Sequence, residues 1–389
     1  MFLLAYKNWS EPIMELSINS ECFHKAISEV SKAVSLKTPF PILTGIKITA
    51  EEDALVLIGS NSDLIIEKKI PLTIDGARVL EVKQTGSVVV TAKYISEIVK
   101  KLPGDIHVKA DGKQLITLQS GEIITSLKGF PSEEYPNMPV IDESSPIRIP
   151  STELLEMIKQ TAFAVAKNES RPVLTGVNLF FKENHLTCAA TNSHRLALRE
   201  LKIDSNIRGS FIIPSTSLNE LVKLIPGETE IIHIFLSDSY IVFKTADSSL
   251  FSRLIEGNYP NVSALIPKDS KTVITLDTKQ FLKGIDRACL FASEWKNNNI
   301  HLEIINGTRL KISSTSSEIG RIEETQPFKN IEGGSELSIS LDANFMIDSL
   351  KAIKEEEINV SFGGSMKPVL IEPVGNPSCL HLISPVRSY

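Results

Sequence analysis

The residues best able to do chemistry lie in the segment Thr191-Asn192-Ser193-His194-Arg195-Leu196, where a serine precedes a histidine. A hydroxyl beside a histidine base is the usual pairing for nucleophilic catalysis. Adjacent residues of a strand point to opposite faces, however, and no acid that would orient the imidazole is identifiable. The plainer interpretation is a loop in which His194 and Arg195 make local hydrogen bonds. We therefore expect no catalysis here.

No other enzyme motif survives inspection. Gly112-Lys113 lacks the upstream glycine and the following Ser/Thr of a phosphate-binding loop, and HExxH, GxGxxG and GxSxG are absent. The seven histidines include no i, i+4 pair that could bind a metal. Cys22, Cys188, Cys289 and Cys379 are too far apart for a CxxC site or a disulfide framework, which is typical of buried, reduced thiols. We expect no metal and no cofactor.

The composition is that of a globular protein. Of its 389 residues, 42% are hydrophobic and 23% charged. No apolar run approaches the roughly 18 residues that span a membrane, and Phe2–Tyr6 is too short and not basic enough for a signal peptide. We expect a cytoplasmic protein with no membrane partner and, at roughly 100 to 200 residues per domain, several domains.

Three short patterns occur twice in the same order. Pro41-Ile42-Leu43-Thr44-Gly45-Ile46 returns as Pro172-Val173-Leu174-Thr175-Gly176-Val177, Lys101-Leu102-Pro103-Gly104 as Leu224-Ile225-Pro226-Gly227, and Tyr135-Pro136-Asn137 as Tyr259-Pro260-Asn261. The offsets are 131, 123 and 124 residues. A unit of about 125 residues fits three times into the chain, so a third copy is predicted to begin near residue 270.

Each copy has the same predicted order of elements. Helical apolar spacing favours helices over 22–36, 92–102, 152–168, 216–225, 278–296 and 343–354. Short β-rich runs between them predict strands, for example over 46–50, 54–59, 107–110, 114–119, 231–236, 240–245 and 357–361. The order helix, strands, helix, strands indicates an α+β fold in which two helices of each copy pack on antiparallel sheet.

Charge is divided unevenly between these elements. The net charge is −6, but the six predicted helices hold 14 Lys/Arg against 8 Asp/Glu, so that they sum to +6 and the remaining chain to −12. Basic helices on an acidic body suggest one surface that meets a polyanion while the rest repels it. The alternative is that lysine is simply a good helix former on solvated faces.

Four segments together resemble one family. Thr191–Leu198 resembles its TDGHRLAL segment, and Arg171–Gly176 its RPxLxG segment. Tyr259-Pro260-Asn261 with Leu265-Ile266-Pro267 is similar to its FPDY…LP stretch, and Leu382–Arg387 to its terminal LxLPxR. The family is the bacterial DNA polymerase III beta subunit, the sliding clamp, and the resemblance covers Met14 to Tyr389.

The resemblance implies three clamp domains over 14–139, 140–267 and 268–389, after an N-terminal extension 1–13 that is expected to be poorly ordered. It also implies a homodimer, closed head to tail into a ring. Such a ring is a non-catalytic processivity factor, grouped with the polymerase holoenzyme, that encircles duplex DNA without reading its sequence. Its implied partners are the DNA polymerase III alpha subunit, the clamp loader and other proteins that carry a clamp-binding motif.

In this family, partners insert a short hydrophobic motif into a pocket between the second and third domains. The motifs carry that role to Leu174, Thr191, His194, Arg195, Leu196, Pro260, Leu265, Leu382, Ile383, Pro385, Val386 and Arg387, and less securely to Met366 and Pro368. For Leu196, Leu265 and Ile383, ordinary core packing is the alternative. DNA contacts are expected from Lys37 and Arg171, in matching loop positions before the two LTG motifs, and from the helix residues Lys93, Lys100, Lys223 and Lys283. For these, a solvated surface position is the alternative.

Two positions depart from the family pattern. Asn192-Ser193 replaces the usual Asp-Gly, so the turn cannot rely on glycine at positive φ. Ser384 replaces Leu or Met and makes the pocket wall more polar. Three hypotheses follow: a processivity clamp, an enzyme acting on nucleotides, and a specialised secondary clamp or decoy that binds partners without supporting replication. The missing motifs argue against the enzyme.

Overall fold

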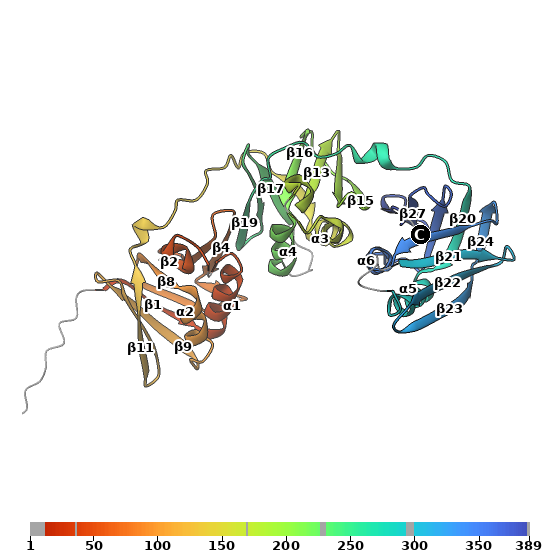
Figure 1. Cartoon of the computed structure of the whole chain (residues 1–389). Coiled ribbons are helices and arrows are strands. Elements are labelled where there is room, and N and C mark those ends of the chain that lie inside the picture. Colours follow the sequence, from red (N-terminus) through yellow and green to blue (C-terminus); the bar gives the residue numbers. More distant parts are fainter. Residues whose placement is uncertain (1–11, 36, 169, 226–230, 293–298, 387–389) are drawn as a thin grey trace, which may run out of the picture. The chain divides into compact units, whose positions relative to one another are not determined.

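The structure is a computed structural model that describes residues 12–35, 37–168, 170–225, 231–292 and 299–386 (Figure 1). Within these ranges every helix follows directly on a strand, without an intervening loop. The helices are α1 (Ser20–Ser31), α2 (Ala92–Val99), α3 (Ser151–Thr161), α4 (Ser215–Leu224), α5 (Thr278–Cys289) and α6 (Ala343–Ala352).

The starts of α1, α5 and α6 are set by side chains at the ends of the preceding strands. Asn19 accepts hydrogen bonds from two backbone amides of α1, at 3.1 and 3.2 Å. Asp277 and Asp342 cap α5 and α6 in the same way, at 2.7 and 3.0 Å. Each cap satisfies backbone N–H groups that the first helical turn leaves without partners, and so fixes where the helix begins.

Two large antiparallel sheets and one small sheet carry the helices. The first runs β12 (Ile147–Pro150), β17 (Ile231–Leu236), β18 (Tyr240–Lys244), β19 (Ser248–Arg253), β4 (Leu64–Pro71), β3 (Ala54–Ser60), β2 (Gly45–Ala50), β8 (Gly86–Thr91), β11 (Ile123–Phe130), β10 (Leu115–Ser120), β9 (Asp105–Asp111), β1 (Pro12–Asn19) and β7 (Leu80–Gln84). The second runs β16 (Gly209–Pro214), β13 (Gly176–Lys182), β14 (His185–Thr191), β15 (Arg195–Lys202), β28 (Cys379–Ile383), β27 (Val369–Pro373), β26 (Glu357–Phe362), β20 (Thr272–Asp277) and β24 (Asn330–Gly333). The small sheet runs β23 (Gly320–Pro327), β22 (Arg309–Ser316), β21 (Asn299–Ile305) and β25 (Ser338–Asp342), and β5 (Thr73–Ile74) pairs with β6 (Ala77–Arg78).

The large sheets run across the boundaries between copies, through two joints of identical register. At the first joint β4 of copy one pairs with β19 of copy two, and at the second β15 of copy two pairs with β28 of copy three. The pair Lys68↔Ser248 becomes Arg199↔Cys379, a shift of 131 residues on both strands. The flanking hydrogen bond from Arg253 N to Asp63 O, 2.7 Å, likewise becomes the one from Ser384 N to His194 O, 2.8 Å. The repeat therefore extends to the way in which its copies are joined.

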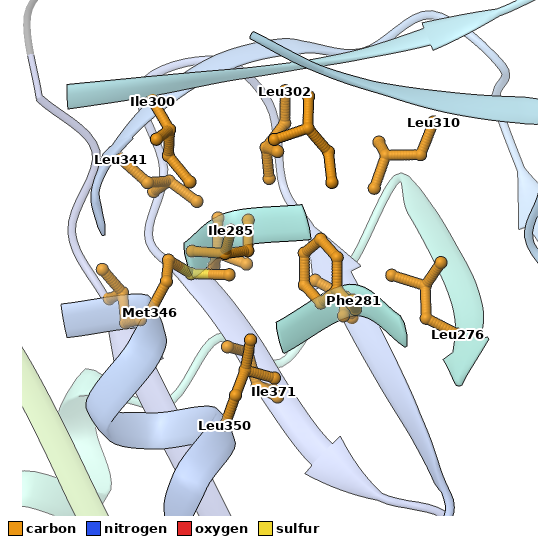
Figure 2. Close-up of a cluster of buried hydrophobic side chains, with 14 of the residues drawn as sticks. Leu276, Phe281, Ile285, Ile300, Leu302, Leu310, Leu341, Met346, Leu350 and Ile371 are labelled. Atoms are coloured by element: carbon orange, nitrogen blue, oxygen red, sulfur yellow. The ribbon is translucent and has the colours of Figure 1, made fainter. Parts of the chain in front are cut away.

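Because strands are shared in this way, the compact units differ from the sequence copies. One unit holds the chain up to Arg148 together with β17–β19, and the other holds the remainder. In the second unit, α5 and α6 cover the sheet of copy three. Phe281 and Ile285 of α5 meet Met346 and Leu350 of α6 and Leu302 of β21 in a fully buried core (Figure 2). These helices show the i, i+3, i+4 spacing that predicted them.

Several predicted boundaries were wrong by a few residues at the C-terminal ends of the helices. The helices end at Ser31, Val99, Thr161, Leu224, Cys289 and Ala352. Within these bounds they contain eight Lys/Arg and eight Asp/Glu, so the helices themselves are neutral. The basic excess that the sequence suggested lies in the segments that follow them, for example at Lys32, Lys100 and Lys167. The prediction of basic helices is corrected accordingly.

Other sequence predictions fall partly outside the described residues. Pro226-Gly227, Lys296 and Arg387 lie there, as do residues 1–11 of the extension, while Pro12 and Ile13 already belong to β1. Cys188 and Cys379 are buried thiols, but Cys22 and Cys289 are only half-buried, which corrects their predicted burial. In the part of the chain that the structure describes, no helix is long and apolar enough to cross a membrane.

Candidate functional site

One turn geometry recurs at the same place in every copy. The Oδ1 of Asn61 accepts hydrogen bonds from the amides of Asp63 and Leu64, 3.1 and 2.8 Å. In the second copy Asn192 does the same for His194 and Arg195, both at 3.0 Å. In the third copy the Ser316 hydroxyl takes this place, at 3.2 and 3.3 Å. The side chains that emerge from this turn differ between copies. The capping hydrogen bonds recur in all three copies, whereas the positive φ that follows the cap occurs only in the first two.

In the first two copies the turn has a residue with positive φ although that residue is not glycine, and a side-chain cap holds the backbone in this conformation. Ser62 and Ser193 adopt φ of 82° and 76°, the left-handed region that favours glycine. The preceding asparagine holds the backbone there, in an Asx turn. His194 is consequently exposed at the tip, whereas Arg195 turns inward as the first residue of β15.

Arg195 is enclosed between the second and third copies. Its side chain is 5% exposed, and Nη1 lies 2.6 Å from Oδ2 of Asp348 on α6. Nη2 donates to the carbonyl of Phe163, and the guanidinium lies 5.2 Å from the Phe163 ring and 4.6 Å from the Phe345 ring. The guanidinium is shielded from water by two aromatic rings and a carboxylate. Because Arg195 belongs to the second copy and Asp348 and Phe345 to the third, these contacts hold the two copies together.

A cavity of about 610 Å³ opens beside this arginine. The turn residues Asn192 and His194 form one wall, the segment Val165–Asn168 after α3 a second, and the start of α6 the third. Asp342, Asn344, Phe345 and Asp348 line the α6 side. Most of the described side chains that line it are polar or charged, and Phe345 is the one aromatic residue among them.

The predicted pocket residues divide between the two faces of the joint. Leu196 and Leu382 are paired across it and pack with Val262, Tyr259 and Ile266 in a hydrophobic cluster. Arg195 and Ile383, also paired, face the other way, and Ile383 belongs to the core of copy three. Alternation along a strand makes this division unavoidable. Ile383 is therefore a core residue, as its alternative interpretation had it.

The remaining predicted residues surround these two faces. Leu174 is buried in a short 3-10 turn, Pro172–Thr175. Thr191 donates from Oγ1 to the carbonyl of Arg195, 2.6 Å, and its amide donates to the Tyr259 hydroxyl, 3.1 Å. Pro260 is exposed and lines a second, polar cavity under the segment 257–263.

Other pocket candidates lie on the surface or in the tail. Leu265 and Met366 are 50% and 57% exposed, and Pro368 is half-buried. Neither of the two cavities described above is lined by any of these three. Pro385 and Val386 are half-buried, and Val386 N donates to the Ser340 carbonyl, 2.8 Å. Arg387 lies outside the described residues.

The predicted DNA-contacting side chains are all exposed. Lys93 and Lys223 lie within α2 and α4, Lys283 lies within α5, and Lys100 caps the C-terminus of α2. Lys223 forms an ion pair with Glu220, 2.7 Å. Lys37 and Arg171 do not occupy matching positions: Arg171 precedes its 3-10 turn as Phe40 precedes the equivalent turn Pro41–Thr44. The predicted match between Lys37 and Arg171 was therefore wrong by three residues, because the equivalent of Arg171 is Phe40.

A buried histidine lies beneath the groove. His381 of β28 is fully buried, with its ring 5.6 Å from that of Phe163 and its Nε2 3.8 Å from Sγ of Cys379. Burial, with the nearby charge of Arg195, lowers the pKa of His381 to about 4. Burial also raises the pKa of the Cys379 thiol to about 12. Both groups are therefore neutral at pH 7, and among the described residues no cluster of three His, Cys, Asp or Glu could hold a metal ion.

Sequence reasoning missed Phe345, Asn344 and Asp348 of α6. Their only sequence signal was position, because they begin the third copy's second helix directly after its Asp342 cap. Nothing in the spacing indicated that this helix end meets the turn of the second copy, 153 residues away.

Comparison with known proteins identifies the chain's relatives. Family models of the DNA polymerase III beta subunit match its N-terminal domain at residues 14–139, its central domain at 148–261 and its C-terminal domain at 263–387. The beta sliding clamp of Bacillus subtilis (strain 168) is 42% identical over 379 residues, 97% of this chain and 100% of that protein. The crystal structure of the Bacillus subtilis clamp matches with a TM-score of 0.94 at 41% identity, over 97% of this chain and 100% of that one. The beta chain from Streptococcus pneumoniae matches at 0.92 and 33% identity, over 96% and 100%. The predicted fold, three repeated domains of mixed helix and sheet, is confirmed.

Proposed function

Because the chain belongs to the family of DNA polymerase III beta subunits, the beta sliding clamps, we propose that it encircles duplex DNA and tethers the replicative polymerase to it. The observation that carries this is the match of all three domains over 97% of the chain. As a member of this family it is a processivity factor and not a catalytic subunit. We place it in the cytoplasm, and we take 14–139, 140–267 and 268–389 as its domains.

The ring is proposed as a homodimer closed head to tail. Each joint within the chain pairs the strand after the shared turn, β4 or β15, with the last strand of the next copy, β19 or β28. The strands in those repeat positions left over are β23 and β11. Within the described residues β23 pairs only with β22, and β11 pairs with β8 only through Gly129 and Phe130. Pairing β23 of one chain with β11 of the next would complete the pattern, and two such contacts close a ring.

Exposed apolar side chains support this pairing. Ile123 and Ile124 at the start of β11 are 46% and 64% exposed. An apolar strand with unpaired backbone groups is an aggregation hazard unless something covers it. A second copy of the chain would cover β11 with its own β23.

The groove beside Arg195 is proposed to take the partner motif. Its aromatic wall, Phe345, and the exposed His194 suit a short amphipathic peptide. The cluster around Leu196 and Leu382 lies on the other face of the joint, and we propose it as a separate apolar contact for the same partner proteins. The alpha subunit of the polymerase, the clamp loader and other motif-bearing proteins would compete for this groove.

Contacts to DNA are proposed for Lys37, Arg171, Lys93, Lys100 and Lys283, with Lys223 in a weaker role beside Glu220. Point charges to phosphate carry no base information, which suits a ring that must slide. The basic segments that follow the helices would contribute more than the neutral helices themselves.

A loading assay tests the proposal. With clamp loader and primed circular DNA, the protein should remain on nicked circles at a salt concentration that strips ordinary phosphate contacts, and linearising the circle should release it. It should also extend the product length of the polymerase. Equal retention on both DNA forms would indicate a conventional DNA-binding protein. Peptide binding without loading would favour the decoy, and loading without stimulation of the replicative polymerase would favour a secondary clamp.

A further inference from the structure

A buried lysine holds the first joint. Lys68 of β4 is 9% exposed, and its Nζ lies 2.7 Å from Oδ2 of Asp247 and 3.0 Å from Oγ of Ser248, in the turn that leads into β19. Oε2 of Glu29 on α1 lies 3.0 Å away on the other side. Burial would lower the pKa of Lys68, but the hydrogen bond to Asp247 and the charge of Glu29 outweigh it, so the pKa is raised. The order across the joint is acid, cation, acid.

The second joint places an arginine at the same point. Arg199 is 131 residues beyond Lys68, and its Nη1 donates to Oδ1 of Asn376 and to Oγ of Ser378, both at 2.7 Å. Ser378 is likewise 131 residues beyond Asp247. A cation that reaches from the strand of one copy into the turn of the next is thus common to both joints within the chain. We call this contact the cation clasp.

The third copy carries the opposite charge at the clasp position. Lys68 pairs with Leu57 on the adjacent strand, Arg199 with Cys188, and Glu324 with Ile312 in the equivalent pairing. The helix partner is inverted too: Glu29 lies ten residues after the cap Asn19, and Arg287 lies ten after the cap Asp277. Nε and Nη2 of Arg287 contact the two carboxylate oxygens of Glu324 at 2.7 and 2.6 Å. This hydrogen bonding lowers the pKa of Glu324, which is therefore ionised.

The turn of the first copy still carries an acid. Ser120 pairs with Ile123 across the two-residue turn Gly121-Glu122, as Thr245 bonds to Ser248 across Ala246-Asp247. Glu122 therefore stands where Asp247 stands in the second copy, and it is exposed.

These positions have a consequence for the proposed dimer, on which the inference rests. We infer that the joint between two chains lacks the cation clasp and instead sets Glu324 of one chain against Glu122 of the partner subunit. Like charges opposite each other across paired strands destabilise the pairing. The chain–chain joint is thus the weak one, and Lys68 and Arg199 are positioning residues that keep the ring from opening within a chain.

Restoring the charge order tests the chain–chain joint. Glu324→Lys combined with Arg287→Glu reproduces the order of the first joint, and the dimer dissociation constant should fall by about tenfold. Sedimentation over a concentration series measures it, with subunit exchange as a second readout. The control exchanges the charges of Lys311 and Glu303, an ion pair at 2.5 Å between β22 and β21, and should leave the dimer unchanged. An unaltered or weaker dimer in the double variant would overturn the inference.

Glu122→Lys supplies a sign test. In the natural background it should tighten the dimer, because the introduced ammonium of one chain would meet the Glu324 carboxylate of the next. In the Glu324→Lys background it should weaken the dimer, because two cations then meet. A residue with a merely structural role would shift both backgrounds in the same direction.

Hydrogen exchange tests the clasp within one chain, independently of dimerisation. Lys68→Met should raise the exchange of the β19 amides about tenfold or more, while Lys68→Arg should preserve their protection. Lys69→Met is the matched control. Lys69 is half-exposed, and its ion pairs with Glu51 and Asp53 are long, at 3.7 Å each, so its removal should have little effect. Unchanged β19 exchange in Lys68→Met would refute the clasp. A wild-type chain that stays monomeric would instead refute the proposed ring, and with it the chain–chain part, but not the clasp.

Discussion

Arg195 shows how one side chain can belong to a groove and to a joint together. It lines the cavity beside His194, yet its guanidinium is committed to Asp348, to the Phe163 carbonyl and to two aromatic rings. Removing the half-exposed Asp348 would leave the buried guanidinium without its carboxylate partner. The arginine therefore sets the width of the groove more than it contacts a ligand. Weakened peptide binding in an Arg195 variant would report the loss of that geometry.

The left-handed backbone at Ser193 makes a sharp prediction. Ser193→Gly should raise the free energy of unfolding by about 1 kcal/mol, because glycine adopts φ of 76° without the strain of a Cβ. Ser62→Gly should act in the same direction. Ser317→Gly, at the third copy's matching position but without positive φ, is the control and should not stabilise. Urea unfolding measures all three, and equal effects at all three serines would contradict the explanation.

His381 predicts a loss of stability in mild acid. Its pKa is about 4 in the folded protein against about 6.5 in an unfolded chain. Above pH 6.5 neither state is protonated and the residue has no effect. Between 6.5 and 4 only the unfolded chain gains a proton, so stability falls, by about 2 kcal/mol at pH 5.

The matched variants are His381→Gln and His185→Gln, the latter at an exposed position. Urea unfolding at pH 7 and pH 5 should show a smaller loss of stability in His381→Gln than in the natural protein. His185→Gln should retain the full loss. If His381→Gln lost as much stability as the natural protein, the buried, neutral imidazole would not be the cause.

At the scale of elements, the second joint is extended by the tail of the chain that follows β28. The tail after β28 is fixed by two backbone hydrogen bonds, from Ser384 to His194 and from Val386 to Ser340. Both acceptors lie in other strands or turns of the second unit. The tail therefore fastens the tip of the shared turn to the sheet of the third copy.

Deleting Ser384–Tyr389 should weaken the binding of a clamp-binding peptide by well over tenfold, because the deletion frees the turn at His194 and removes the apolar Pro385 and Val386. Titration calorimetry on the intact and shortened proteins measures the change. The sedimentation of the dimer should be unaltered, since the tail is assigned to the groove. Unchanged peptide affinity would place the partner site elsewhere.

Sequence predicted the elements better than their mutual positions. The pattern over 278–296 was enough to predict α5, and three short patterns that recur in the same order were enough to predict the repeat. The faces were harder, because Leu196 and Arg195 are neighbours in sequence and reach opposite sides of the sheet. Phe345 escaped notice because the contact that matters is tertiary, and helix ends were overestimated because apolar spacing continues through the turns after Ser31 and Thr161.

At the scale of the whole molecule, light scattering should give about twice 42.9 kDa at micromolar concentration. Ile124→Glu should shift the mass toward the monomer, because it places a charge on the apolar edge of β11. Val140→Glu is the control: Val140 is 98% exposed and lies outside every strand. A dimer that tolerates Ile124→Glu as well as Val140→Glu would exclude this edge from the interface.

The two joints also determine the order in which parts of the chain can fold during synthesis. Ser248, which accepts a hydrogen bond from Lys68, is synthesised 180 residues after it. Ser378, which accepts one from Arg199, is synthesised 179 residues after that arginine. At about 5 to 20 residues per second, β4 leaves the ribosome roughly 10 to 40 s before β19 arrives to cover its edge. Within the described residues β23 pairs with β22 alone, so its other edge has no partner strand in the same chain. During synthesis the chain therefore presents an open strand edge, first at β4 and later at β15, until the strand that completes each joint has been made.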